Sequence, residues 1–291
     1  MIHPGDSLLV LGLGYTGTAV ALAAVAAGMA AAGTSRDPAR VVPAGLQVVD
    51  FAAAGDAIAG ATHLLQTAAP QADGDPALLR YRDAIAAARR LRWIGYFSTT
   101  GVYGDRDGEW VDEATPPAPR TDRTRRRVDA EASWAAARPD LPVDVFRLAG
   151  IYGPGRSVFD DVRNGTARRI DKPGHCFGRI HRDDIAAAVL AAMRQDRAPG
   201  LRVLNLADDE PAESAHVIEE AARLLGVPPP PAIPFAAAEA AMSPMARGFW
   251  SESRKVSSRA TKAALGIAWR YPGYREGLRA ILAEQSADRP A

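Results

Sequence analysis

The chain has 291 residues, of which 47% are hydrophobic and 24% charged, as in ordinary globular proteins. Its formal net charge of +1 gives no reason to expect a nucleic-acid partner. The single cysteine, Cys176, excludes an internal disulfide and favours a reducing, cytoplasmic compartment. Residues 1–6 lack the basic region of a signal peptide. The longest apolar stretch, residues 19–32, is too short to span a bilayer, so we expect no membrane partner.

The first predicted element is a buried strand over residues 8–11, which runs through a glycine turn into a helix that includes residues 19–27. This order matches the Gly-x-Gly-x-x-Gly turn of dinucleotide-binding proteins, in which free N–H groups at the helix N-terminus meet a pyrophosphate. The first glycine allows the tight turn, the second lets a ligand approach the backbone, and the third lets the helix lie near the strand. The predicted cofactor-binding residues of this turn are Gly12, Gly14, Tyr15, Thr16 and Gly17.

A second strand is predicted over residues 29–34 and ends at Ser35 and Arg36. In a dinucleotide fold this position meets the adenosine ribose, where an acidic residue binds the 2′-hydroxyl of NAD and an arginine pairs with the 2′-phosphate of NADP. The Ser35-Arg36 pair therefore favours NADP(H) as the cofactor over NAD. The alternative is that Arg36 is an ordinary surface arginine.

Further strands are predicted over residues 46–50, 62–67 and 93–98, with a helix over residues 75–90. Strands that alternate with helices indicate an α/β fold with a Rossmann-like, doubly wound parallel sheet. A ligand of such a sheet lies beyond the carboxyl ends of the strands. The residues at those ends that we expect to contact the cofactor are Asp50, Phe51, Thr67, Ala68 and Ser98.

The next segment carries the candidate chemistry. A hydroxyl-rich turn, Ser-Thr-Thr-Gly-Val-Tyr-Gly-Asp, occupies residues 98–105, and a helix is predicted over residues 121–137. A sixth strand over residues 143–148 runs into Ala-Gly-Ile-Tyr-Gly-Pro-Gly at 149–155.

These motifs together resemble the extended short-chain dehydrogenases/reductases, the NAD(P)-dependent epimerase/dehydratase group. Arg-Ile-His-Arg-Asp-Asp-Ile-Ala at 179–186 and Asn-Leu-Ala-Asp-Asp-Glu-Pro at 205–211 resemble two further motifs of the group. The resemblance covers nearly the whole chain. It implies an NAD(P)-binding Rossmann domain over residues 1–150, to which residues 181–206 return. Residues 151–180 and 207–291 would then form a smaller C-terminal substrate lobe.

The chain departs from this family at its acid/base pair. The family uses Tyr-x-x-x-Lys on the helix after the fifth strand, but the matching positions hold Arg123 and Arg127. An arginine stays protonated, so Arg123 cannot act as a proton shuttle, whereas Arg127 could replace lysine as a fixed positive charge. The two arginines are four residues apart and share a helix face, which would suit an anionic substrate. The alternative is a solvated, arginine-rich helix start.

Another group must then move the proton. The candidates are Tyr103 and, as an alternative, Tyr152, although both could be packing aromatics. Thr99 matches the family's substrate-orienting hydroxyl and can donate a hydrogen bond to a carbonyl. The position of His181 favours a structural histidine. The tentative catalytic set is therefore Thr99, Tyr103 and Arg127.

Two classes of function remain open. The first is an NADP(H)-dependent oxidoreductase or epimerase that acts by hydride transfer on a small substrate of unknown identity. The second is a binding or sensor protein that keeps the nucleotide site without catalysis. Phe177 and Gly150 depart from the pattern of nucleotide-sugar enzymes, although we expect Gly150 to lie beside the cofactor. No residues have metal-ligand spacing, and we expect a monomer or a homodimer.

Overall fold

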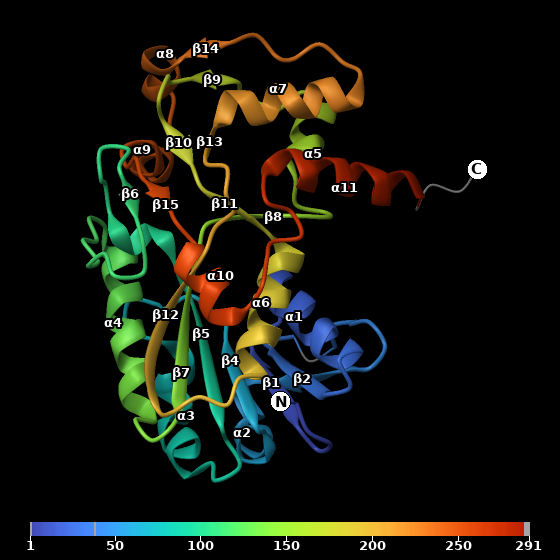
Figure 1. The fold of residues 1–291 in the computed structure, drawn as a ribbon, viewed down its shortest axis with the longest axis vertical. Coiled ribbons are helices and arrows are strands. Elements are labelled where there is room, and N and C mark those ends of the chain that lie inside the picture. Colours follow the sequence, from blue (N-terminus) through green and yellow to red (C-terminus); the bar gives the residue numbers. More distant parts are fainter. Residues whose placement is uncertain (1, 38, 288–291) are drawn as a thin grey trace.

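A seven-stranded, wholly parallel sheet forms the centre of the computed structural model, which describes residues 2–37 and 39–287 (Figure 1). The spatial order is β12-β7-β5-β4-β1-β2-β3, so the strand order reverses between β1 and β4. This doubly wound arrangement confirms the predicted fold class, and each predicted strand lies within one residue of its expected ends. The strands are β1 (Ser7–Leu11), β2 (Ala30–Ser35), β3 (Leu46–Asp50), β4 (His63–Gln66), β5 (Trp93–Thr99), β7 (Pro142–Leu148) and β12 (Gly200–Leu206).

Helices cover both faces of the sheet, because both faces of its strands are apolar and must be buried. On one face, α1 (Tyr15–Ala26) and α6 (Arg182–Met193) pack against one another and contribute the fully buried Val20 and Val189. On the other face, Ile58, Ile85 and Trp134 belong to one buried cluster. These three residues come respectively from α2 (Gly55–Gly60), α3 (Pro76–Ala87) and α4 (Asp122–Ala137).

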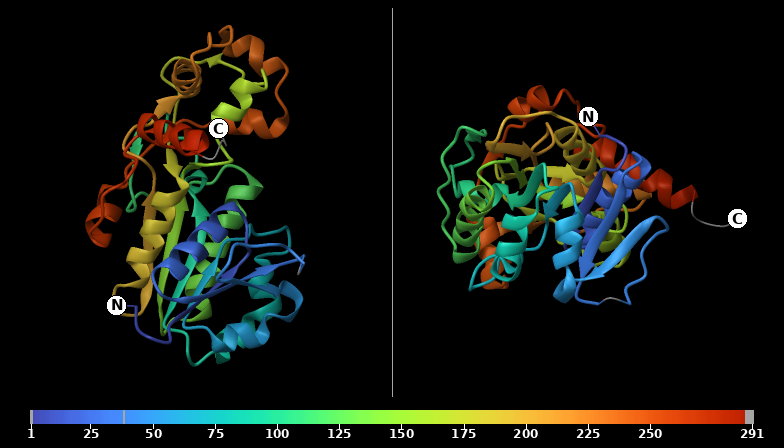
Figure 2. Two further views of the ribbon diagram at one scale, coloured as in Figure 1. Left: turned by 90° about the vertical axis from the view of Figure 1, so that its right-hand side faces the viewer. Right: turned by 90° about the horizontal axis from the view of Figure 1, so that it is seen from below.

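A second lobe lies beyond the carboxyl ends of the sheet strands and is the upper part of Figure 1 and of the left view of Figure 2. Its core contains Phe159, Val217 and Leu278, and a smaller cluster surrounds Trp250. Its helices are α5 (Val158–Arg163), α7 (Ser214–Leu225), α8 (Phe235–Ala240), α9 (Pro244–Trp250) and α11 (Tyr274–Ala287). Two short strand pairs join them, β9 (Ile170–Asp171) with β14 (Ile233–Pro234), and β10 (Cys176–Phe177) with β13 (Ala212–Glu213).

Short elements connect the two parts. β8 (Gly150–Tyr152) pairs with β11 (Arg179–His181), and β6 (Trp110–Val111) pairs with β15 (Lys255–Val256). The remaining elements are α10 (Arg259–Leu265) and the 3-10 turns η1 (Phe51–Ala53) and η2 (Thr100–Tyr103). Val256, Leu265 and Trp269 belong to the main core with the sheet. This part of the predicted C-terminal lobe therefore packs on the Rossmann unit.

No helix in the described ranges is long and apolar enough to cross a membrane.

Candidate functional site

The glycine loop between β1 and α1 is packed tightly at two glycines and open at the third. Gly12 has a φ of +109°, and a Cβ atom there would lie 2.9 Å from Thr67 Oγ1. A Cβ atom on Gly17 would lie 2.5 Å from the Gly12 carbonyl oxygen, so only glycine fits. A Cβ atom on Gly14 would meet no protein atom within 4 Å, and no side chain caps α1 at this residue. The helix N-terminus therefore faces open space with its N–H groups available to an anion.

Two hydroxyls hold the glycine loop in place. Thr67 Oγ1 donates a hydrogen bond to the Gly12 carbonyl oxygen at 2.6 Å, and the Tyr15 hydroxyl donates to the Pro154 carbonyl oxygen at 2.9 Å. The guanidinium of Arg156 lies 5.7 Å from the centre of the Tyr15 ring. Burial raises the pKa of the Tyr15 phenol. Tyr15 thus ties the glycine loop to the loop that follows β8.

The residues predicted to meet the adenosine lie at the carboxyl ends of β2 and β3, where Ser35 and Asp50 are register partners. Ser35 Oγ accepts from the Asp37 amide, and Asp50 Oδ1 accepts from the Ala52 amide. Arg36 is exposed to solvent beside them. Phe51 packs edge-on against Tyr81. None of these four predicted residues lines the large cleft described next, and their contact with a ligand stays a prediction.

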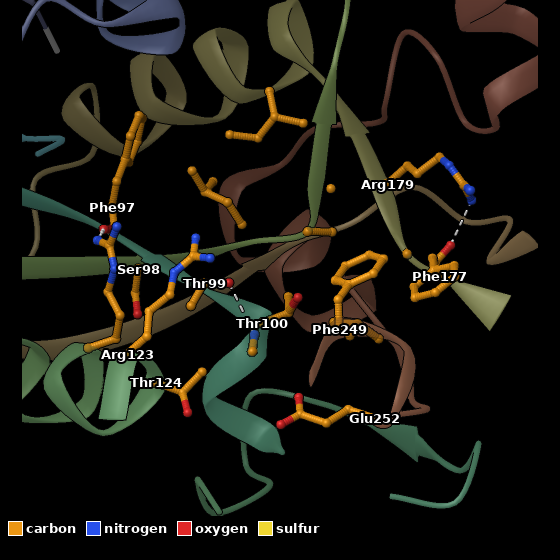
Figure 3. Close-up of a pocket in the computed structure, with 18 of the residues that line it drawn as sticks. Phe97, Ser98, Thr99, Thr100, Arg123, Thr124, Phe177, Arg179, Phe249 and Glu252 are labelled. Atoms are coloured by element: carbon orange, nitrogen blue, oxygen red, sulfur yellow. Dashed lines mark hydrogen bonds between the residues drawn. The ribbon is translucent and has the colours of Figure 1, made fainter. Parts of the chain in front are cut away.

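A cleft of about 1000 Å³ extends from the glycine loop across the ends of β5 and β7 to the second lobe (Figure 3). It lies at the edge of the sheet where a doubly wound fold binds its ligand. The predicted site residues that line it are Gly14, Tyr15, Thr16, Gly17, Thr67, Ser98, Thr99, Arg127 and Gly150.

Thr99 lies at the end of β5 and caps the turn that follows. Its Oγ1 accepts a hydrogen bond from the Gly101 amide at 3.1 Å. No acceptor for its hydroxyl hydrogen is found among the described residues, and Thr99 lines the cleft. The hydroxyl can therefore donate to an oxygen atom of a ligand.

Both arginines of the substituted acid/base pair line the cleft. Arg127 Nη1 donates to the Phe97 carbonyl oxygen at 2.6 Å and to the Tyr96 hydroxyl at 3.2 Å. Arg123 is exposed and extends toward Thr99 (Figure 3), and within the described ranges it has no hydrogen bond or ion pair. Arg125, on the same helix, pairs with Asp122 and does not line the cleft. The helix α4 thus presents one anchored cation and one unpaired cation to the cleft.

The two candidate phenols do not line the cleft, which favours the alternative interpretation of both as packing aromatics. Tyr103 is fully buried, and its hydroxyl donates to Asn205 Oδ1 at 2.7 Å. The Tyr152 hydroxyl donates to the Gly273 carbonyl oxygen at 3.3 Å. Burial raises the pKa of both phenols, and neither lines the cleft. Both positions are those of packing aromatics whose hydroxyls are satisfied inside the fold.

His181 has a structural position, in agreement with its interpretation from the sequence. Its Nδ1 accepts from the Asp183 amide at 3.2 Å and caps α6. The ring packs edge-on against Tyr152, and burial lowers its pKa to about 4. His181 is therefore neutral at neutral pH.

Sequence reasoning missed Arg156 and Phe249. Arg156 follows the Gly-Pro-Gly turn directly and lines the cleft near the glycine loop, a position that its neighbours in the sequence do not reveal. Phe177 and Phe249 form an aromatic wall with ring centres 4.4 Å apart. The described residues contain no group of three or more potential ligands that could hold a metal ion.

The parallel sheet, the open glycine loop and the cleft at the strand ends define a Rossmann-type, doubly wound fold. No protein-family model matches the chain. Solved structures resemble the chain over nearly its whole length. A functionally unknown conserved protein from Silicibacter pomeroyi is 46% identical, with a TM-score of 0.89 over 96% of this chain and 99% of that chain.

Two further solved structures have the same fold over nearly the whole chain. A structure from Methylobacillus flagellatus, assigned provisionally to the NAD-dependent epimerases/dehydratases, is 25% identical, with a TM-score of 0.69 over 97% of this chain and 99% of that one. A human epimerase family protein, SDR39U1, solved with NADPH, is 20% identical and has a TM-score of 0.73 over 95% and 99% of the two chains. The chain thus has the fold of the NAD-dependent epimerases/dehydratases, and positions 123 and 127 hold arginines in place of the Tyr-x-x-x-Lys pair that the resemblance implies.

Curated relatives match over shorter stretches. Protein YeeZ from Escherichia coli K12 is 34% identical over 146 residues, which cover 50% of each chain. The 3-diazoavenalumate denitrifying reductase from a Streptomyces species is 31% identical over 186 residues, which cover 58% of each chain. The chain thus aligns with about half the length of these relatives.

Proposed function

We propose that the protein is an NADP(H)-dependent oxidoreductase that acts by hydride transfer on a small substrate with an anionic group. The observation that carries the proposal is the continuous cleft that joins the open glycine loop to Thr99, Arg123 and Arg127. The name of the Streptomyces relative, a reductase, supports the same reaction class.

The residues around the glycine loop fit a dinucleotide. The pyrophosphate would lie against the uncapped N-terminus of α1, in the space in front of Gly14. Ser35 and Arg36 would bind the 2′-phosphate, because no carboxylate occupies those two positions to accept a 2′-hydroxyl. The remaining predicted contacts of the cofactor are Asp50, Phe51, Thr67, Ala68, Ser98 and Gly150.

The bound nicotinamide would supply or accept the hydride, and the protein would hold the substrate. Thr99 donates a hydrogen bond to the oxygen atom on which negative charge develops. Arg127, anchored on the end of β5, contributes a fixed positive charge beside it. No histidine or lysine lines the cleft among the described residues, the Tyr15 hydroxyl is engaged with Pro154, and Glu252 is paired with Arg254. Burial raises the pKa of the Cys176 thiol, which also lines the cleft, so water would supply the proton.

A non-catalytic NADP(H) sensor is the second candidate, and a specific observation favours it. The only phenol that lines the cleft in the described ranges is Tyr15, whose hydrogen is already donated to a backbone carbonyl. An enzyme without an acid of suitable pKa gains less from general acid catalysis. The two candidates share the nucleotide site and differ in turnover.

Calorimetric titration with NADPH, NADP⁺, NADH and NAD⁺ tests the shared part. We expect NADP(H) to bind, and the Arg36→Ala variant to bind it at least about tenfold more weakly because a phosphate-guanidinium pair is lost. NAD(H) affinity should not change. Arg89→Ala is the matched control. Arg89 is an exposed arginine that precedes β5, so it lies near the amino-terminal ends of the strands and away from the cleft. Failure of all four nucleotides to bind would refute both candidates.

Turnover separates the two candidates. If the protein is an enzyme, it should oxidise NADPH with at least one compound from a panel of carbonyl-containing and unsaturated carboxylic acids. The reaction is followed as the loss of NADPH absorbance. The rate should fall at least about tenfold in Thr99→Val, which keeps the shape of the side chain and removes the hydrogen-bond donor. Tight nucleotide binding without turnover on the whole panel would favour the sensor.

A further inference from the structure

The outer half of the cleft presents an aromatic surface. Phe177 on β10 and Phe249 on α9 stack with ring centres 4.4 Å apart and planes 5° apart. The Trp250 ring packs edge-on against Phe177, with the two ring centres 5.0 Å apart. Phe249 keeps 58% of its surface exposed, although it lines a cleft (Figure 3). Phe249 therefore exposes apolar area to the cleft, and a planar ligand would cover that area.

An unpaired cation reaches the same cleft from the other side. Arg123 extends from α4 toward Thr99, and Phe249 projects from the second lobe, with Thr99 and Thr100 between them (Figure 3). Within the described residues Arg123 has no carboxylate or carbonyl partner. Such a guanidinium is free to take a ligand carboxylate through two parallel hydrogen bonds.

The carboxylate that lines the cleft does not cancel this charge. Glu252 accepts from Arg254 Nη1 at 2.8 Å, and that guanidinium also donates to the Gly104 carbonyl oxygen. Arg127, which also lines the cleft, adds a second positive charge. The lining is therefore cationic at α4 and aromatic at α9. Arg156 and Arg179 also line the cleft, and Arg179 donates to the Phe177 and Ala212 carbonyl oxygens.

We propose that the substrate is a carboxylic acid with a planar, unsaturated or aromatic body. Its carboxylate would pair with Arg123, and its planar body would cover the exposed Phe249 ring. The inference rests on the proposed function, because it identifies the substrate class of the same cleft.

Three probes of similar size test the two parts of the recognition. trans-Cinnamate carries both features, cinnamamide has the same planar body without the charge, and 3-cyclohexylpropanoate has the charge without the planar body. Calorimetry on the protein saturated with NADP⁺ should give the tightest binding for trans-cinnamate. Equal or tighter binding of either other probe, or no binding of trans-cinnamate, would overturn the proposal.

Variants test which residue recognises the carboxylate and which recognises the planar body. Arg123→Gln should weaken trans-cinnamate at least about tenfold and leave cinnamamide unchanged, because a charge-assisted pair is lost. Phe249→Leu should weaken both planar probes about fivefold and leave 3-cyclohexylpropanoate unchanged. Arg125→Gln is the matched control on α4 and should change nothing, since Arg125 pairs with Asp122 outside the cleft. An unchanged trans-cinnamate affinity in Arg123→Gln would refute the assignment.

The same preparations distinguish this inference from the proposed function. NADP⁺ affinity and the melting temperature are measured for each variant, and the probe titrations are repeated without nucleotide. Normal NADP⁺ binding without discrimination among the probes refutes the substrate class alone. Absence of NADP⁺ binding refutes the proposed function, while the probe titrations on the free protein still decide whether Arg123 and Phe249 bind an unsaturated acid.

Discussion

The Ser98 hydroxyl donates its hydrogen to the Glu131 carboxylate at 2.5 Å, and so joins the cleft to a buried ion pair. Arg147 holds the same carboxylate through Nε and Nη2, at 3.1 and 2.7 Å. Its guanidinium lies 4.8 Å from the centre of the Tyr103 ring, whose hydroxyl meets Asn205. Because the Ser98 hydrogen is already donated, its oxygen can only accept hydrogen bonds from a ligand in the cleft.

Glu131→Gln should therefore destabilise the fold. Glu131 and Arg147 are both nearly fully buried, so the substitution leaves an uncompensated charge in the interior. We expect the free energy of unfolding, measured by urea denaturation at pH 7, to fall by about 3 kcal/mol. Asp140→Asn is the control, because the Asp140 side chain is 62% exposed in its pair with Arg138. Its cost should be below about 1 kcal/mol, and equal effects of the two variants would contradict the prediction.

Two glycine substitutions should separate folding from binding. Gly17→Ala places its Cβ against the Gly12 carbonyl oxygen, so we expect the free energy of unfolding to fall by about 2 kcal/mol. Gly14→Ala meets no protein atom, and its φ of −81° suits any residue. Its melting temperature should change little. The methyl group would instead occupy the space in front of the helix N-terminus and weaken NADP⁺ at least about tenfold. Unchanged nucleotide affinity in Gly14→Ala would argue against the pyrophosphate position.

Tyr103→Phe and Tyr152→Phe should behave as packing variants. Loss of the Tyr103 hydroxyl leaves Asn205 Oδ1 without its donor, so stability should fall by about 1–2 kcal/mol. NADP⁺ affinity and any turnover should stay within about twofold of the wild-type values, since neither phenol reaches the cleft. A tenfold loss of turnover at unchanged melting temperature would restore the phenol concerned as a proton donor.

His63 should make stability fall in acid. The ring is buried in β4 beside Trp93, and burial lowers its pKa from the usual 6.5 to about 4. Between pH 6.5 and pH 4 the unfolded chain therefore binds a proton that the folded chain excludes, so stability rises with pH through this window and is lost as pH falls. The loss for this group between pH 7.5 and pH 4.5 should be about 2 kcal/mol.

Urea denaturation of the wild type and His63→Gln at both pH values checks this effect. The variant lacks the titrating group, so its stability should fall less between pH 7.5 and pH 4.5 than that of the wild type. His216→Gln, which replaces an exposed histidine of α7, is the control and should follow the wild-type profile. Parallel profiles for all three proteins would show that His63 is not the source.

Local sequence patterns are sufficient for the sheet and the nucleotide loop. Alternating apolar strands and helices predict the parallel sheet, because each strand buries both faces, and Gly12 and Gly17 mark the turn where no Cβ fits. The same sequence shows that arginines replace the family's tyrosine and lysine. These properties depend on residue type and on spacing within a few turns of chain.

Tertiary packing decides which side chains face the cleft. Tyr103 lies on the turn that follows β5, at the end of the sheet where a catalytic phenol could lie. Its side chain is nevertheless buried, because Asn205, 102 residues away in the chain, accepts its hydroxyl hydrogen. Phe177 and Phe249 stack although 72 positions separate them in the chain. Arg123 stands free because α4 presents it to a cleft whose opposite wall comes from another lobe. The direction of a side chain depends on partners distant in sequence, and only the folded chain brings them together.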